Sequence, residues 1–280
     1  MKLNATTLSV ILCSVSVLGC GESTEPVEEL FSWSGVIAQG DQIEVKGVNG
    51  DVLAAPTTGS EVVLSALTDD HESDPSQVSF EVITHEAGVT ICALYPDVPG
   101  EPPNECLPGD QGHMGARESD LEVTFVVGVP AGVVLVGRTV NGNVSAELMQ
   151  SDSYIYTVNG FAIVSTVGQA MASSVNGFIN AAVGSANWDR DLEFITVNGN
   201  VTVQIPSSTS AEVHASAVNG VITSDFSLTE VAPGVMQGVI GIGGPLLTLS
   251  TVNGNITLLQ GSGPSLVVAR AADGRLGWTP

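Results

Sequence analysis

The sequence predicts an all-β protein built as a parallel β-helix, or β-solenoid, whose short strands stack in successive rungs. A repeated Asn-Gly phrase carries this prediction, and its clearest copy runs from Thr196 through Asn198 and Gly199 to Val203. Val, Ile and Gly are abundant between the copies. Short β-branched runs between turn residues are typical of strands, and no stretch shows the period of about 3.6 residues that an amphipathic helix requires.

The spacing of the phrase favours stacked rungs over hairpins. Its glycines at positions 142, 160, 177, 199, 220 and 254 are separated by 18, 17, 22, 21 and 34 residues. A period near 20 is typical of solenoids, whereas hairpin meanders turn about every 8–12 residues. The 34-residue step predicts one additional rung whose Asn-Gly has drifted to Gly241 or Gly243-Gly244.

Each Asn-Gly is interpreted as a corner where the rung bends. The glycine supplies freedom of φ, the flanking valines point into the core, and the Asn amides hydrogen-bond from rung to rung. Asn-Gly also favours type I′ hairpins, so a β-sandwich or a β-roll stays as the alternative fold. The predicted corners are Asn49, Gly50, Asn141, Gly142, Asn159, Gly160, Asn176, Gly177, Asn198, Gly199, Asn219, Gly220, Asn253 and Gly254.

The N-terminus has the pattern of a targeting segment. Residues 1–19 are interpreted as a signal peptide, because Lys2 precedes an apolar run too short to span a bilayer. Val17-Leu18-Gly19-Cys20 resembles the lipobox of bacterial lipoproteins, which implies an acylated Cys20 and a protein of the cell envelope, at the outer membrane. An ordinary signal peptide with an incidental cysteine is the alternative. Residues 20–31 are predicted to form a flexible tether, and residues 32–280 a single solenoid domain.

The first part of that domain is read as strands separated by loops. Strand patterns occupy residues 31–55, 62–64, 78–84, 89–94, 121–129 and 133–136. The acidic segment 69–75 has carboxylates that suit calcium but lacks the glycine and the alternation of an EF-hand loop, which favours a solvated turn. Residues 109–115 are rich in glycine, but no Gly-Lys-Ser/Thr follows them, so they are not a phosphate loop.

Two cysteines remain after processing. Cys13 leaves with the signal peptide and Cys20 carries lipid, so Cys92 and Cys106 are predicted to form a disulfide that closes a proline-rich loop. Closing a loop of this length contributes about 3 kcal/mol to stability in the chain-entropy model. A metal-binding pair or redox thiols are the alternative, although no second ligand pair and no close Cys-x-x-Cys accompany them.

Charge and motifs exclude several classes of function. A formal net charge of -23 opposes binding to nucleic acid, which requires a basic surface. The four histidines, at positions 71, 85, 113 and 214, are scattered, so no metal and no cofactor are predicted. Lys46, Arg138 and Arg190 look isolated, which disfavours a lyase acting on acidic sugars. Trp188-Asp189-Arg190-Asp191 is either a sugar-stacking site or an exposed turn in which Arg190 pairs with its neighbours.

Repeated Val-Asn-Gly rungs after a lipobox resemble the bacterial DUF4097 family of adhesin-like β-strand repeat proteins, related to DUF2807 head domains. The resemblance extends over residues 35–280, including Cys92, Cys106 and the corner at Gly142. It implies a right-handed parallel β-helix and provides no catalytic residues. The sequence therefore predicts a lipid-anchored, non-enzymatic, adhesin-like scaffold whose partner is an unidentified protein or glycan. The alternative is a carbohydrate-binding or carbohydrate-cleaving β-helix.

Overall fold

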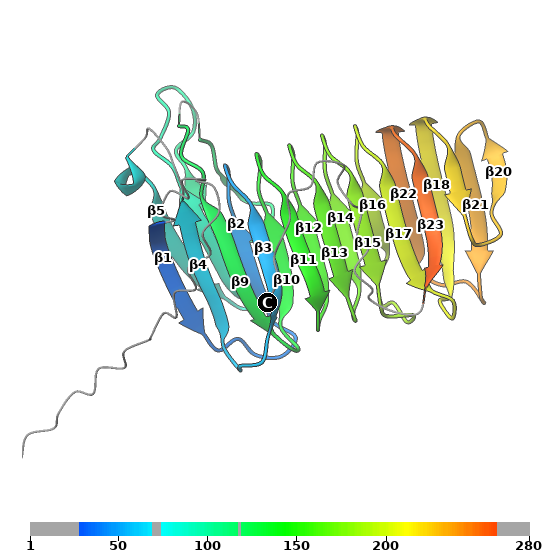
Figure 1. The fold of residues 1–280 in the computed structure, drawn as a ribbon, viewed down its shortest axis with the longest axis horizontal. Coiled ribbons are helices and arrows are strands. Elements are labelled where there is room, and N and C mark those ends of the chain that lie inside the picture. The colour runs from blue at the N-terminus through cyan, green and yellow to red at the C-terminus, as the bar shows by residue number, and fades with distance from the viewer. Residues whose placement is uncertain (1–27, 69–73, 117–118, 262–280) are drawn as a thin grey trace, which may run out of the picture.

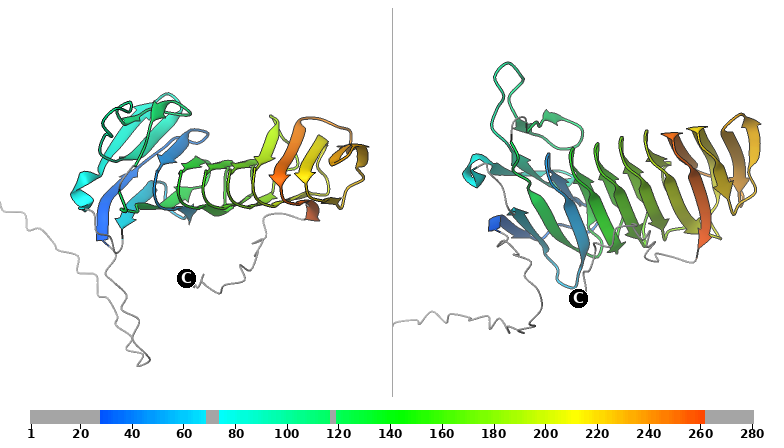
Figure 2. Two further views of the ribbon diagram at one scale, coloured as in Figure 1. Left: turned by 90° about the horizontal axis from the view of Figure 1, so that it is seen from above. Right: turned by 45° about the horizontal axis from the view of Figure 1, so that its top comes forward.

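The structure, a computed structural model, describes residues 28–68, 74–116 and 119–261. These residues form an elongated, flattened stack of strands (Figure 1). Two long sheets run along the stack, sheet A with ten strands and sheet B with eleven. Seen from above, the middle of the molecule looks like a ladder, because each step joins one strand of each sheet (Figure 2). The protein is therefore all-β and built as a solenoid with two faces.

The order of the strands along each sheet differs from their order in the chain. In spatial order, sheet A contains β1 (Glu28–Gly35), β4 (Val62–Thr68), β9 (Thr124–Pro130), β3 (Val52–Thr57), β11 (Val144–Met149), β13 (Ala162–Thr166), β15 (Ile179–Val183), β17 (Val201–Pro206), β23 (Ile256–Gly261) and β19 (Ile222–Ser224). Sheet B contains, in the same manner, β20 (Thr229–Ala232), β21 (Val235–Ile240), β18 (Ala211–Asn219), β22 (Leu246–Asn253), β16 (Leu192–Ile195), β14 (Ala170–Ser173), β12 (Ser153–Tyr156), β10 (Val134–Arg138), β2 (Gln42–Lys46), β6 (Gly88–Leu94) and β5 (Ser79–His85). A separate pair joins β7 (Glu105–Cys106) to β8 (Gly112–His113), and a 3₁₀ turn covers Pro75–Gln77.

A rung consists of one sheet B strand, an Asn-Gly corner and one sheet A strand. The rungs are β2–β3, β10–β11, β12–β13, β14–β15, β16–β17, β22–β23 and β18–β19. Neighbouring rungs pair in parallel in both sheets. Parallel pairing confirms the predicted solenoid, because the alternative sandwich of hairpins would pair consecutive strands in antiparallel fashion.

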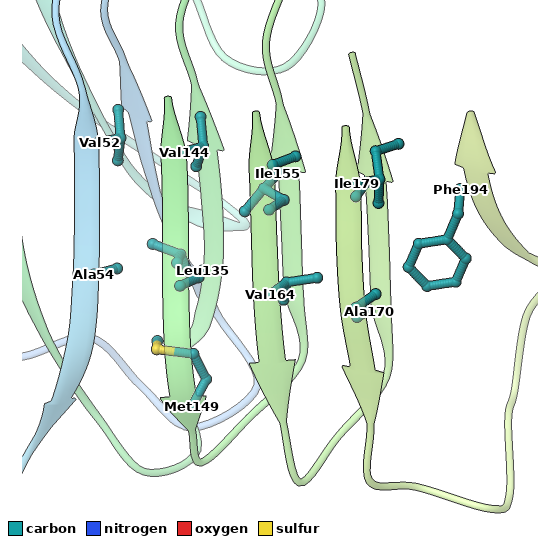
Figure 3. Close-up of a cluster of buried hydrophobic side chains, with 14 of the residues drawn as sticks. Val52, Ala54, Leu135, Val144, Met149, Ile155, Val164, Ala170, Ile179 and Phe194 are labelled. Carbon is teal, nitrogen blue, oxygen red and sulfur yellow. The ribbon is translucent and has the colours of Figure 1, made fainter. Parts of the chain in front are cut away.

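Alternating residues build the core between the two sheets. In β17, Val201, Val203 and Ile205 are fully buried, whereas Thr202 and Gln204 lie on the outer face. Figure 3 shows side chains of the two layers meeting in the interior, with Val144 and Val164 from sheet A near Leu135 and Ile155 from sheet B. Each rung adds only a few such residues, so the core becomes substantial only when rungs stack.

The rungs at the C-terminal end are interleaved. The last rung in sequence, β22–β23, lies between β16–β17 and β18–β19. The additional rung predicted in the 34-residue step is absent from the described residues: the chain there forms the antiparallel strands β20 and β21, and β21 pairs with β18 to extend sheet B. Gly241 and Gly243 lie in the turn after β21 rather than at a corner. That prediction was wrong because a turn at glycine can lead into either a parallel or an antiparallel strand, and the glycine alone does not decide between them.

The N-terminal end of the stack is rearranged in a similar way. Strands β6 and β9 lie outside the first rung, parallel to β2 and β3. Beyond them, β4 and β1 extend sheet A, and β5 extends sheet B, all with antiparallel pairing. The chain thus adds β6 and β9 to one side of the first rung, β2–β3. It then crosses to the opposite side of that rung, where β10 pairs with β2.

Several predicted segments fall outside the described residues. These are the signal peptide at residues 1–19, the lipidation residue Cys20, most of the 20–31 tether and most of the acidic 69–75 segment. Strand β1 starts at Glu28, so residues 28–31 belong to sheet A and not to a tether. No helix within the described part of the chain is long and apolar enough to cross a membrane.

Candidate functional site

The predicted corner residues form a continuous ladder along one edge of the stack. Beyond Asn49, the first of the series, each Asn side chain donates a hydrogen bond from Nδ2 to Oδ1 of the preceding Asn, over 2.7–2.9 Å. The expected amide bonds from rung to rung are therefore present. In space the ladder runs Asn49, Asn141, Asn159, Asn176, Asn198, Asn253 and Asn219.

The corner glycines serve a different purpose from the predicted one. Among them only Gly50 has a positive φ, of 108°. At the others, a Cβ would collide with a backbone carbonyl of the adjacent rung; at Gly160 it would meet the oxygen of Gly142. Close approach of neighbouring backbones, rather than φ freedom, is thus why glycine is required. The valine before Asn49, Val48, is buried as expected, but at most other corners the valine before the Asn is exposed; Val197, for example, is 37% exposed, whereas Val201 after the corner is buried.

A loop held by the disulfide lies on the outer face of sheet B. Cys92 in β6 is bonded to Cys106 in β7, with Cα atoms 5.9 Å apart, which confirms the predicted pairing. The Lys46 ammonium donates three hydrogen bonds to loop carbonyls, those of Leu107, Gly109 and Gln111, at 2.8–3.0 Å. The loop is therefore fixed by both covalent and polar contacts.

Glu44, two residues before Lys46 in β2, completes this attachment. Its carboxylate is fully buried and accepts hydrogen bonds from Thr90 Oγ1 at 2.9 Å and from the Gly109 backbone N–H at 2.8 Å. The other oxygen pairs with Arg138 Nε at 2.8 Å. A buried carboxylate is tolerated when it is paired and hydrogen-bonded in this way. Lys46 and Arg138 are thus not isolated, contrary to expectation.

The outer face of sheet B also carries two tyrosine side chains. Tyr154 and Tyr156 alternate with the inward Ile155 on β12, so both point outward. Arg138 lies over the Tyr156 ring at 4.3 Å from its centroid, and Arg190 lies over Tyr154 at 5.5 Å. In residues 153–156 the two tyrosines alternate with other residues, a pattern that places both on one face of a strand. The predictions from the sequence did not use this pattern.

Two depressions flank the stacked Arg138–Tyr156 pair. The first, about 250 Å³, lies between the disulfide loop and β10, against Lys46, Asp110 and Arg138. The second, about 240 Å³, lies on the other side of Tyr156 over β14. Both open on the outer face of sheet B, which is therefore the candidate binding surface.

Burial shifts several pKa values on or near this face. Desolvation raises the pKa of Tyr154, Tyr156 and Tyr95 above the usual tyrosine range. Desolvation also lowers the pKa of Lys46, although the nearby Glu44 opposes that shift. The tyrosine hydroxyls are thus held in the neutral form, so they can donate hydrogen bonds across the neutral pH range.

The segment 188–191 is a structural turn. Trp188 is only 8% exposed, packs in the core and donates from Nε1 to the carbonyl of Ser185 at 2.8 Å. It cannot stack on a ligand. Asp189 accepts from Gln169 Nε2 at 2.9 Å and from Arg190 at 3.3 Å, so Arg190 pairs with its neighbour as the second interpretation expected. Asp191 accepts from the Leu246 N–H and fixes the start of β22.

The described histidines lie on three different strands. His85 contacts Thr90 at 3.0 Å, His214 contacts Gln237 at 2.9 Å, and His113 is exposed in β8. His71 lies outside the described residues. Within residues 28–68, 74–116 and 119–261, no group of three His, Cys, Asp or Glu side chains is arranged to hold a metal.

Comparisons with known proteins give only distant likenesses. No protein-family model and no curated protein matches the chain. A "putative cell adhesion protein" from Clostridium sporogenes aligns over 84% of this chain and 100% of its own, with 7% identity and a TM-score of 0.44. A "putative adhesin" from Bacteroides fragilis aligns over 84% and 97%, with 11% identity and a TM-score of 0.35. These values carry no argument about function, and the resemblance to the DUF4097 family stays a prediction.

Proposed function

We propose that this protein is a lipid-anchored, non-enzymatic binding module of the bacterial cell envelope, adhesin-like in role, with the outer face of sheet B as its contact surface. The observation that carries the proposal is the concentration of tyrosine, arginine and carboxylate side chains on that one face. Large aromatic and arginine side chains are the residue types that dominate binding energy at interfaces.

The anchor follows from the sequence around Cys20. Acyl chains on this residue contribute roughly 0.8 kcal/mol for each buried methylene, so several chains hold the protein at a membrane without a spanning helix. Labelling cells with a fatty-acid analogue tests this part. We expect label on the wild-type protein and none on Cys20→Ala, whereas label that persists on the variant contradicts the anchor.

An attachment assay tests the binding role. Bacteria producing the wild-type protein, Cys20→Ala or Ser173→Trp are compared for retention on a layer of cells of the same strain. Ser173 lies on the outer face of β14, so the indole fills the depression there. Bacteria that produce either variant are expected to be retained no better than bacteria that lack the protein. Equal attachment by all strains overturns the role, and release of reducing ends from polysaccharide overturns its non-enzymatic character.

A further inference from the structure

The depression over β14 has a defined shape because of the register between strands. Tyr156 of β12 is paired with Ser173 of β14, and Ser173 is paired with Ile195 of β16. Neighbouring strands lie about 4.8 Å apart, so the small serine leaves a gap between two larger side chains. Met171 and Glu193, two residues back along β14 and β16 on the same outer face, close the gap at its other end.

One wall of this gap is an aromatic ring held in place. The β10 side of the Tyr156 ring is covered by Arg138, which is itself fixed by Glu44 and by Asp110 at 2.8 Å each. The opposite side of the ring faces β14 and the depression. A ring fixed in this way loses little conformational entropy when a ligand stacks on it.

The β16 side of the gap, across β14 from Tyr156, provides a hydrogen-bond acceptor. Glu193 is exposed at the rim, and among the described residues its carboxylate has no ion-pair or hydrogen-bond partner. The volume of about 240 Å³ is below the roughly 300–1,000 Å³ of pockets that enclose a drug-sized ligand. An open site of this size suits one unit of a longer chain.

We propose that the depression formed by Tyr156, Met171, Ser173, Glu193 and Ile195 binds one unit of a neutral oligosaccharide. The C–H face of the sugar stacks on the free side of Tyr156, because such hydrogens are attracted to the negative face of an aromatic ring. Sugar hydroxyls donate to Glu193. The net charge of -23 repels acidic glycans. This inference rests on the proposed function, since it names the ligand of the same face.

Titration calorimetry with neutral hexasaccharides tests the site. The probes are cellohexaose, maltohexaose and chitohexaose, with hexagalacturonate as the acidic comparison. We expect at least one neutral probe to bind the wild-type protein. Tyr156→Ala, which removes the ring, and Ser173→Trp, which fills the gap, are each expected to weaken binding by about tenfold or more. Tyr156→Phe keeps the ring face and is expected to retain binding.

Thr223→Trp is the matched control, because Thr223 is exposed on the outer face of sheet A. If Tyr156→Ala fails to fold, Ser173→Trp still tests the site, because the side chain at position 173 faces solvent and its replacement leaves the core unchanged. Absence of binding by all three neutral probes, preference for hexagalacturonate, or full affinity in Ser173→Trp overturns the proposal. If cell attachment is still lost in Cys20→Ala and Ser173→Trp, the proposed binding role is retained and only the neutral oligosaccharide is rejected as the ligand.

Discussion

At the scale of single residues, the corner glycines limit what each rung can tolerate. Gly142, Gly160, Gly177 and their equivalents approach the backbone of the adjacent rung so closely that no side chain fits between them. Five of the seven corner glycines have a threonine or serine three residues before them, and its hydroxyl reinforces the same contact. Thr196 Oγ1, for example, donates to the Gly177 carbonyl at 2.8 Å. A corner is therefore a point where main chains pack directly on each other.

Gly160→Ala is expected to lower the free energy of unfolding by about 3 kcal/mol, because the new methyl group forces adjacent rungs apart. Chemical denaturation measures the change. Gly59→Ala is the control, since the φ of Gly59 is not in the left-handed region and a Cβ there would make only ordinary contacts, at 3.9 Å. We expect the control to be neutral or slightly stabilising. Equal stability of the two variants would show that the corner can relax.

The three tyrosines provide a test by pH. Their pKa values are raised by burial, so the folded state keeps its phenolic protons where the unfolded chain, with a tyrosine pKa of about 10, releases them. Stability is therefore unaffected below about pH 10 and falls as the pH rises above it. Absorbance of tyrosinate near 295 nm is expected to stay low above pH 10 until the protein unfolds. Gradual ionisation around pH 10 in folded protein contradicts the burial.

At the scale of elements, the disulfide loop and strand β2 act as a unit. The loop is attached at Cys92–Cys106, and its backbone is bonded to Glu44 and Lys46. These attachments differ in kind, so they are expected to fail independently.

A Cys92→Ala, Cys106→Ala double variant is expected to lose about 3 kcal/mol of stability. The Lys46 and Glu44 bonds remain, so the loop is expected to stay in place. Hydrogen exchange at the Gly109 amide, which donates to Glu44, reports on this. Continued protection of that amide supports polar attachment, whereas free exchange shows that the covalent bond alone holds the loop.

Glu44→Gln leaves the Arg138 cation without its buried partner and is expected to cost roughly 3 kcal/mol. The Gly109 amide is then expected to exchange faster than in the double cysteine variant. Glu212→Gln serves as control, because Glu212 is exposed on β18 and its replacement should change stability by less than about 0.5 kcal/mol. Equal melting temperatures for the two variants would contradict the role of Glu44.

At the scale of the whole molecule, the interleaved rung order links distant parts of the chain. Strand β22 pairs with β16 on one side and β18 on the other, and β23 likewise joins β17 to β19. The β18–β21 segment thus has no direct pairing with β16–β17 in the described structure. Its attachment depends on residues that follow it in the chain.

Truncation after Pro245 removes β22 and β23 and is expected to detach the β18–β21 segment. Hydrogen exchange should show β18 losing protection while β10–β15 keep theirs, because solenoid stability is transmitted between nearest neighbours. Truncation after Gly261 retains all described strands and is the control. Unchanged protection of β18 in the shorter chain would mean that β18 can pair directly with β16.

Much of the fold follows from local pattern. The Asn-Gly phrase predicted where rungs bend, and alternation of apolar and polar residues predicted which side chains face the core, as at Val201 and Thr202. Elimination among the four cysteines predicted Cys92–Cys106. These features depend on neighbours along the chain or on repeated equivalents, so a single sequence contains the information.

Only the tertiary structure decided the rest. Every rung carries the same phrase, so the pattern cannot specify which rung stacks on which, and the insertion of β22–β23 between earlier rungs was not predictable from it. The same reason applies to the binding face. Lys46, Arg138 and Tyr156 are far apart in sequence and become neighbours only when β2, β10 and β12 align in register. The sequence by itself determined the rung, and the three-dimensional stack determined its order and its functional surface.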